Sequence, residues 1–238
     1  MELLFEIEPV SRRDKLVGRV RALEGLVDWL DIPDSPMGRS RFFSPLASCI
    51  AKNVSHVKVV AHLRVIDVSR VALESILKGL ELCNVERIAF VRGDLVEGST
   101  AVRDVEPEDA VKLAKSTTKL EAGLTISLRK PIEDIEKRLS SGADFYLVLN
   151  LNRDTIEKLE AIERVSRKLG VKLYPYVVLL TEANRSKLLG ILERWKLHEP
   201  EEALKLVEAS NDIVDGVLIS SPGDFQGGLR FVERLRKR

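Results

Sequence analysis

The chain has 238 residues, 45% hydrophobic and 32% charged, so it is long enough to bury a large core in one domain. Its 38 Lys and Arg residues are balanced by 37 Asp and Glu residues, which argues against a general nucleic-acid or anionic-membrane binder. No apolar run approaches the roughly 18 residues of a membrane span, and the first ten residues lack the pattern of a signal peptide. We therefore expect a soluble, cytoplasmic protein.

The two cysteines, Cys49 and Cys83, belong to no paired-cysteine motif. Neither a metal centre nor a disulfide framework is therefore expected. Glutamine occurs once, at Gln226, in a chain rich in Glu, Lys and Arg. This bias is typical of heat-adapted proteins, because ion pairs lose less to desolvation at high temperature. The composition thus points to a thermophile.

Short apolar or β-branched runs alternate with longer amphipathic runs along the whole chain. This pattern predicts eight strands, at residues 3–8, 26–32, 57–64, 87–92, 120–128, 145–151, 172–180 and 214–220. It predicts helices at residues 12–23, 45–52, 68–82, 107–115, 132–140, 155–169, 184–195, 200–209 and 225–238. Strict alternation requires parallel pairing with crossover helices. We predict one domain over residues 1–238, an α/β protein folded as a single (β/α)8 TIM barrel.

An open doubly wound sheet is the competing fold. A dinucleotide-binding version would carry a glycine fingerprint after the first strand. Residues 9–13 read Pro-Val-Ser-Arg-Arg instead, which favours the barrel.

Polar side chains are predicted to converge at the C-terminal ends of the strands, where active groups of a barrel collect. In the first strand the alternating pattern turns Glu6 and Glu8 inward. By the same alternation, further polar residues end the third, fourth and sixth strands: His62, Arg64, Arg92, Asp94, Asn150 and Asn152. We interpret this end as a functional site. The alternative is an ion network in which Glu6 and Glu8 pair with Arg64 or Arg92.

The remaining polar or glycine-rich features of the sequence have a structural explanation, are left open between two explanations, or are given no function. Asp31 and Asp34 flank a proline and are explained by turn chemistry. The glycine-containing segment 220–228 opens the last helix, where it fits either a phosphate site or a flexible helix start. His56 and His198 are assigned no role.

Five short segments carry a family resemblance. They read Phe-Glu-Ile-Glu-Pro at 5–9, Asp-Ser-Pro-Met-Gly-Arg at 34–39, Ala-His-Leu at 61–63, Val-Arg-Gly-Asp-Leu at 91–95 and Ser-Gly-Ala-Asp-Phe at 141–145. In order and spacing they resemble segments of the methylenetetrahydrofolate reductases, flavin-dependent barrel enzymes of one-carbon metabolism. Where that family has a flavin-binding Tyr-Pro-Glu segment, residues 127–131 read Ser-Leu-Arg-Lys-Pro. The chain therefore resembles a divergent member.

The resemblance implies a flavin-dependent oxidoreductase that reduces a 5,10-methylene unit on folate or a related pterin to a methyl group. It makes Glu6 the general acid and gives Asp94 a catalytic and pterin-binding role, with Asn150 as a second substrate contact. His62, Arg92 and Asp94 would contact the flavin, FAD or else FMN, and no metal is implied. The electron donor would be NAD(P)H or a partner protein. The oligomeric state is left open between a homo-oligomer and a complex with a partner subunit.

The lost Tyr-Pro-Glu segment leaves two other interpretations open. In one, the pterin is kept but another electron carrier or a partner subunit replaces the resident flavin. In the other, the chain is a non-catalytic or flavin-free pterin-binding subunit of a one-carbon enzyme complex.

Overall fold

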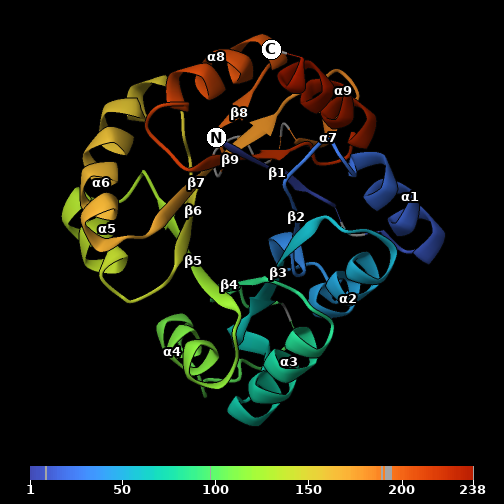
Figure 1. The fold of residues 1–238 in the computed structure, drawn as a ribbon, viewed down its shortest axis with the longest axis vertical. Helices are drawn as coiled ribbons and strands as arrows, with labels where there is room; N and C mark the ends of the chain where they lie inside the picture. The colour runs from blue at the N-terminus through green and yellow to red at the C-terminus, as the bar shows by residue number, and fades with distance from the viewer. Residues whose placement is uncertain (9, 97, 189, 191–194, 238) are drawn as a thin grey trace.

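A computed structural model describes residues 1–8, 10–96, 98–188, 190 and 195–237. Parallel strands form a closed barrel surrounded by helices, as Figure 1 shows. The strands are β1 (Glu2–Glu6), β2 (Trp29–Ile32), β3 (Lys58–Arg64), β4 (Arg87–Val91), β5 (Glu121–Ser127), β6 (Phe145–Leu149), β7 (Lys172–Leu179), β8 (Leu197–His198) and β9 (Gly216–Ser220). The α-helices are α1 (Arg13–Leu23), α2 (Ser44–Val54), α3 (Arg70–Leu82), α4 (Pro107–Thr117), α5 (Ile132–Leu139), α6 (Ile156–Leu169), α7 (Arg185–Leu188), α8 (Pro200–Ser210) and α9 (Phe225–Arg236).

The predicted (β/α)8 barrel is confirmed. Strands β1 to β7 and β9 pair in parallel around the ring, which closes through the β6–β7 and β7–β9 pairings. The short strand β8 pairs with the end of β7 and was not predicted. Of the helix predicted at 184–195, the structure describes α7, while residues 189 and 191–194 lie outside the described residues. Within the described residues, no helix is both long and apolar enough to cross a membrane.

The side-chain alternation of the strands separates two apolar layers. Outward residues such as Phe5, Ile7 and Leu63 pack in the layer between the strands and the helices. Inward residues form a second cluster along the barrel axis: Leu4, Trp29, Val60, Ala89, Phe145, Leu147, Tyr174, Tyr176, Val178 and Leu218. The predicted inward direction of the first strand's glutamates follows from this arrangement, because Phe5 and Ile7 both belong to the outer layer.

Arg87 closes the N-terminal end of the barrel. Its guanidinium stacks 3.7 Å above the ring centroid of Trp29, and its side chain is 1% exposed. Its Nε donates to Glu121 at 2.6 Å, and its Nη1 donates to the Tyr174 hydroxyl at 3.0 Å. Stacking and paired hydrogen bonds allow arginine to be buried without an unpaired charge. This end of the barrel is therefore a stability element.

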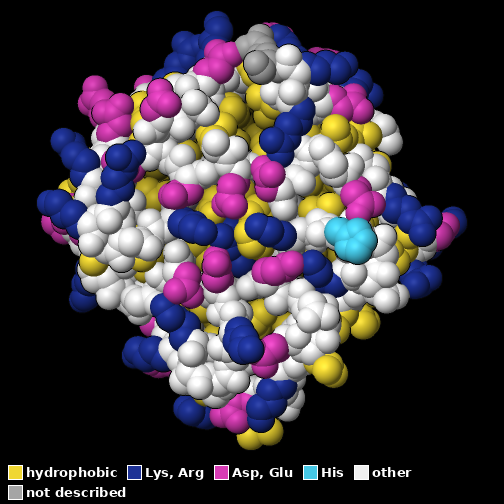
Figure 2. All heavy atoms as spheres, viewed as in Figure 1, with side chains coloured by type: hydrophobic (Ala, Val, Ile, Leu, Met, Phe, Trp, Pro, Cys, Tyr) yellow, Lys and Arg dark blue, Asp and Glu magenta, His cyan; other side chains and the backbone are white. Residues whose placement is uncertain are grey.

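Charge on the surface is mixed in sign. Figure 2 shows Lys and Arg side chains interspersed with Asp and Glu over the face it displays, including around the barrel axis. This distribution agrees with the near-zero net charge of the sequence and provides no extended basic surface on that face.

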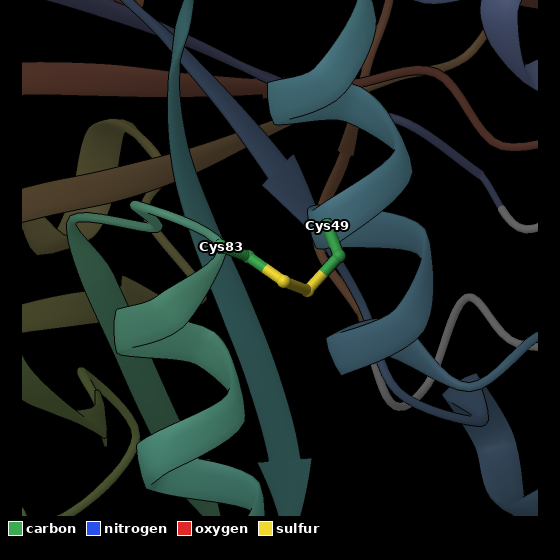
Figure 3. The surroundings of a disulfide bond; sticks show 2 residues. All are labelled: Cys49 and Cys83. Carbon is green, nitrogen blue, oxygen red and sulfur yellow. A yellow bond between two sulfur atoms is a disulfide. The ribbon is translucent and has the colours of Figure 1, made fainter.

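Cys49 and Cys83 form a disulfide bond, so the sequence expectation of no disulfide was wrong. Cys49 lies on α2 and Cys83 follows the last residue of α3, as Figure 3 shows. The two residues are 34 positions apart, and only the packing of neighbouring barrel helices brings them together. Disulfides are rare in the reducing cytosol of mesophiles but occur inside hyperthermophiles. A disulfide in a cytoplasmic protein would therefore fit the heat-adapted source that the sequence composition indicates.

We expect reduction of the Cys49–Cys83 bond to lower stability by about 3 to 4 kcal/mol, because a 34-residue loop regains its freedom in the unfolded chain. For a chain of this size that corresponds to a fall in Tm of roughly 6 to 16 °C. Calorimetry with and without dithiothreitol measures the change. A Cys49→Ser/Cys83→Ser variant is the control, and its Tm should not respond to reductant. An unchanged wild-type Tm would contradict the prediction.

Replacing Arg87 by alanine should lower the free energy of unfolding by about 3 to 5 kcal/mol, because Tyr174 and two glutamates lose a buried partner. The matched control is Arg70→Ala, which removes an exposed pair with Glu74 and should cost less than about 1 kcal/mol. Urea unfolding of the three proteins checks this expectation. Equal losses in the two variants would show that Arg87 is not a stability element.

Candidate functional site

Five polar side chains meet at the C-terminal end of the barrel, at the ends of β1, β2, β3, β7 and β9. They are Glu6, Asp31, His62, Tyr176 and Ser220. Asp31 is completely buried, and its two carboxylate oxygens lie 2.7 Å from His62 Nε2 and 3.2 Å from the Tyr176 hydroxyl. Ser220 Oγ donates to Glu6 at 2.7 Å. The barrel thus holds an acid, a buried carboxylate, an imidazole and a phenol in one place.

Asp31 is a site residue that sequence reasoning missed. Turn chemistry was the expected explanation, but Asp31 lies within β2, with Trp29 on the same inward face. The inward position of Asp31 could have been predicted from the alternation of side chains along the strand, because its neighbours Leu30 and Ile32 belong to the outer layer. Asp34 does serve the turn, since its carboxylate accepts hydrogen bonds from Ser35 Oγ and from the Arg64 backbone N–H.

Secondary contacts fix His62 in its orientation toward Asp31. The His62 backbone N–H donates to Ser44 Oγ at 3.0 Å, and Ser44 Oγ in turn donates to the Ile32 carbonyl oxygen at 2.5 Å. Ser44 is the first residue of α2, so the helix start is tied to both β2 and β3. These contacts fix the backbone of His62, while the hydrogen bond to Asp31 holds its ring.

Burial, followed by the nearby Asp31 carboxylate, raises the pKa of Glu6 to about 7. Burial disfavours the charged imidazole of His62, but the attraction and hydrogen bond of Asp31 outweigh it and raise the pKa of His62. Burial and the two carboxylates raise the pKa of Tyr176 well above its ordinary value. Near neutral pH, Glu6 is therefore poised to hold or release a proton, whereas Tyr176 keeps its own.

The ion network expected as the alternative is not formed by the described residues. Arg64 directs Nε to Asp67 at 2.7 Å and Nη2 to the Asp94 carbonyl oxygen at 2.7 Å. Arg92 faces Glu106 at 3.4 Å. The Glu6 carboxylate instead accepts a hydrogen bond from the uncharged Ser220 hydroxyl. Among the described residues no arginine pairs with Glu6, so burial raises its pKa.

A cavity of about 100 Å³ opens beside this cluster. Its lining consists of Glu6, Glu8, Pro33, Pro36, Tyr176, Val178, Leu188, Trp195, Leu197, Ser220 and Pro222. The walls are mainly apolar, and the charged groups among them are two carboxylates. The Trp195 Nε1–H is buried without a hydrogen-bond partner in the described part of the chain. Apolar walls with a few convergent polar groups are typical of a small-molecule site.

The other predicted site residues lie on the rim of the same barrel end. Arg92 and Asp94 follow β4 and are exposed, and neither belongs to the cavity lining. Asn150 follows β6 with a φ of 66°, and its Nδ2 donates to Ser127 Oγ at 3.0 Å. Of the predicted residues, the structure therefore brings Glu6 and His62 together and places Arg92, Asp94 and Asn150 around them.

The loop after β9 is not arranged for phosphate. Asp224 caps α9 by accepting from the Gly227 N–H at 2.9 Å, and it also accepts from Thr181 Oγ1 at 2.7 Å. Glu8 accepts from the Gly223 N–H at 3.2 Å. Carboxylates therefore occupy donors that a phosphate would need, and the glycines of this segment belong to a helix start.

His62 is not available as a flavin contact, and the described residues form no metal site. No group of three or more His, Cys, Asp or Glu side chains in the described chain is arranged to hold a metal ion. The His62 ring is 5% exposed and engaged by Asp31, so it does not reach the rim.

The raised pKa of Glu6 predicts a particular pH dependence of stability. Between the ordinary value of 4.5 and the folded value of about 7, the folded protein binds the proton more tightly, so stability falls as pH rises. The raised pKa of His62 acts in the same direction, and the part of that shift that comes from Asp31 is retained in a Glu6→Gln variant. From pH 5 to pH 8, we expect wild type to lose about 2 to 3 kcal/mol relative to Glu6→Gln. Urea unfolding at both pH values measures it; a constant difference would place the Glu6 pKa in its ordinary range.

Comparisons with known proteins find relatives in structure alone. No family model matches the sequence, and no curated protein sequence does. One similar structure is an uncharacterised protein from Clostridium thermocellum that binds two copies of 5-methyl-5,6,7,8-tetrahydrofolic acid, with a TM-score of 0.71, 12% identity and coverage of 99% of this chain and 95% of that one. Another is a mutant tryptophan synthase α-subunit from Pyrococcus furiosus, with a TM-score of 0.65, 13% identity and coverage of 100% and 98%. At these identities the likeness establishes the TIM-barrel fold.

Proposed function

We propose that the protein binds a reduced pterin carrier of the folate type at the C-terminal end of the barrel and reduces its 5,10-methylene unit to a methyl group. The observation that carries the proposal is Glu6, an acid with a pKa of about 7 beside an apolar cavity. The methyltetrahydrofolate-binding structure with the same fold supports the choice of carrier, as does the sequence resemblance of residues 3–150 to the methylenetetrahydrofolate reductases.

Glu6 supplies the proton that the reaction requires. The proton passes from its carboxyl group to a bridge nitrogen, the bond between that nitrogen and the methylene carbon breaks, and an iminium remains at the other nitrogen. A hydride with its two electrons then adds to that carbon and forms the methyl group. General acid catalysis is most effective when the pKa lies near the operating pH, as that of Glu6 does.

The neighbouring residues position this acid. Asp31, held by His62 and Tyr176, places a fixed negative charge beside Glu6. That charge disfavours ionised Glu6 before the reaction and stabilises the cationic iminium after the proton has left. Ser220 orients the acid through its 2.7 Å hydrogen bond.

The hydride donor in this proposal is a dissociable reduced flavin, itself reduced by NAD(P)H or by a partner protein. This version agrees with the absence of the family's Tyr-Pro-Glu segment at residues 127–131. The donor would approach over the rim that Arg92, Asp94 and Asn150 form. It is oxidised by two electrons when the methylene carbon is reduced.

Replacing Glu6 by glutamine should retain the fold and carrier binding but lower the reduction rate by about 100 to 10,000-fold, because glutamine has no acidic proton. The assay follows conversion of 5,10-methylenetetrahydrofolate to 5-methyltetrahydrofolate under anaerobic conditions with chemically reduced flavin mononucleotide. Glu74→Gln, an exposed change on α3, is the matched control.

An equally active Glu6→Gln variant would remove Glu6 from the mechanism. A wild-type protein that binds 5-methyltetrahydrofolate without reducing the methylene form would instead identify a pterin-binding subunit. A protein that binds neither compound would refute the proposed function.

A further inference from the structure

The cavity beside Glu6 contains two features that the proposed reaction does not use: the carboxylate of Glu8 and the unpaired indole N–H of Trp195. We propose that they form the specificity pocket for one planar nitrogen heterocycle, with Glu8 accepting hydrogen bonds from adjacent N–H groups on the ring edge and the Trp195 indole N–H donating to an acceptor atom of the ring. The inference rests on the proposed function, in which this heterocycle is the pyrimidine ring of the pterin.

Glu8 is held in place but retains acceptor capacity. Its Oε2 accepts from the Gly223 N–H at 3.2 Å, while a carboxylate offers about four lone-pair sites. Arg19 of α1 donates to the Glu8 carbonyl oxygen at 2.9 Å and brings a positive charge near the residue. The cavity lining itself contains Glu6 and Glu8 and no lysine or arginine. This charge pattern selects a ligand edge rich in N–H donors and disfavours a carboxylate or phosphate.

Trp195 provides the second, independent observation. It packs on the inner barrel cluster together with Leu197, and its ring lines the cavity together with Tyr176. Its Nε1 is buried and has no partner in the described residues, although buried donors in native proteins are nearly always paired. An acceptor atom on a bound ring would satisfy this donor. The two aromatic walls favour a flat guest.

The volume limits how much of the carrier enters. A cavity of about 100 Å³ is the space of roughly three water molecules, which suits one ring but not a whole folate. The benzoyl-glutamate tail carries carboxylates and would therefore extend to the rim, where the Arg92 side chain is 67% exposed. This placement puts the donor edge of the ring against Glu8, whereas the family resemblance implies Asp94.

The chain offers a specific optical readout, because its two tryptophans lie at opposite ends of the barrel. Trp29 packs under Arg87 at the N-terminal end, and Trp195 lines the cavity. A Trp29→Phe protein therefore reports on Trp195 alone. The probes are 6-methyltetrahydropterin, the corresponding tetrahydrolumazine that has a carbonyl in place of the 2-amino group, p-aminobenzoylglutamate and 5-methyltetrahydrofolate.

We expect 6-methyltetrahydropterin to change Trp195 emission saturably and p-aminobenzoylglutamate to leave it unchanged. Glu8→Gln should weaken binding of 6-methyltetrahydropterin by about 10-fold or more. The tetrahydrolumazine, which lacks the 2-amino group, should bind the protein with Glu8 intact more weakly than 6-methyltetrahydropterin by a similar factor. Trp195→Phe, measured by calorimetry, should also weaken binding of 6-methyltetrahydropterin, since phenylalanine keeps a ring but lacks the donor. Glu74→Gln is the matched control. The analogue comparison needs no variant, so it stands even if Glu8→Gln does not fold.

Two outcomes would overturn the inference while leaving the proposed function intact. In one, 5-methyltetrahydrofolate binds but Trp195 emission does not change and Glu8→Gln binds it equally well. In the other, Asp94→Asn rather than Glu8→Gln weakens binding of 6-methyltetrahydropterin. If neither 6-methyltetrahydropterin nor 5-methyltetrahydrofolate binds, the proposed function itself fails and the specificity pocket fails with it.

Discussion

The buried carboxylate of Asp31 is the constraint on which the C-terminal end of this barrel depends. A charge with no solvent exposure is tolerated only when hydrogen-bonded partners surround it, and here His62 and Tyr176 provide them from two other strands. Once those partners are fixed, the Asp31 carboxylate lies close enough to Glu6 to disfavour its ionised form. The pKa of Glu6 rises to about 7 as a result of burial and of this neighbour. One buried charge thus ties three strands together and adds to the burial that raises the pKa of Glu6.

The two ends of the barrel treat buried charge in opposite ways. At the N-terminal end, Arg87 is neutralised by Glu121, stacked on Trp29 and hydrogen-bonded to Tyr174. At the C-terminal end, Glu6 faces a hydroxyl instead of a cation, and Trp195 keeps an unpaired donor. Complete pairing stabilises a fold, whereas incomplete pairing leaves groups available for a ligand. The contrast is a physical reason to place the site at the C-terminal end.

The small, acidic and aromatic character of the cavity also narrows the chemistry. Two carboxylates without a lining cation suit a ring that donates hydrogen bonds, and the carboxylates at the start of α9 occupy the place where many barrels bind phosphate. Function in this fold follows from such local chemistry and not from the barrel itself, which hosts many reactions. The proposed pterin chemistry therefore depends on the contacts of Glu6, Glu8 and Trp195 more than on structural likeness.

The sequence by itself determined the barrel, because alternating strands and amphipathic helices admit few other arrangements. It also determined the inward direction of Glu6 and the position of His62, since a strand's period of two links each polar residue to its outward neighbours. The same alternation also indicates that Asp31 points inward, but the proline close to it favoured an explanation by turn chemistry. Tertiary structure alone decided the rest. The partners of Glu6, the contact of Trp195 with the cavity and the Cys49–Cys83 bond each join residues far apart in the chain. Their pairing is set by how the closed barrel brings its elements together, which no local pattern specifies.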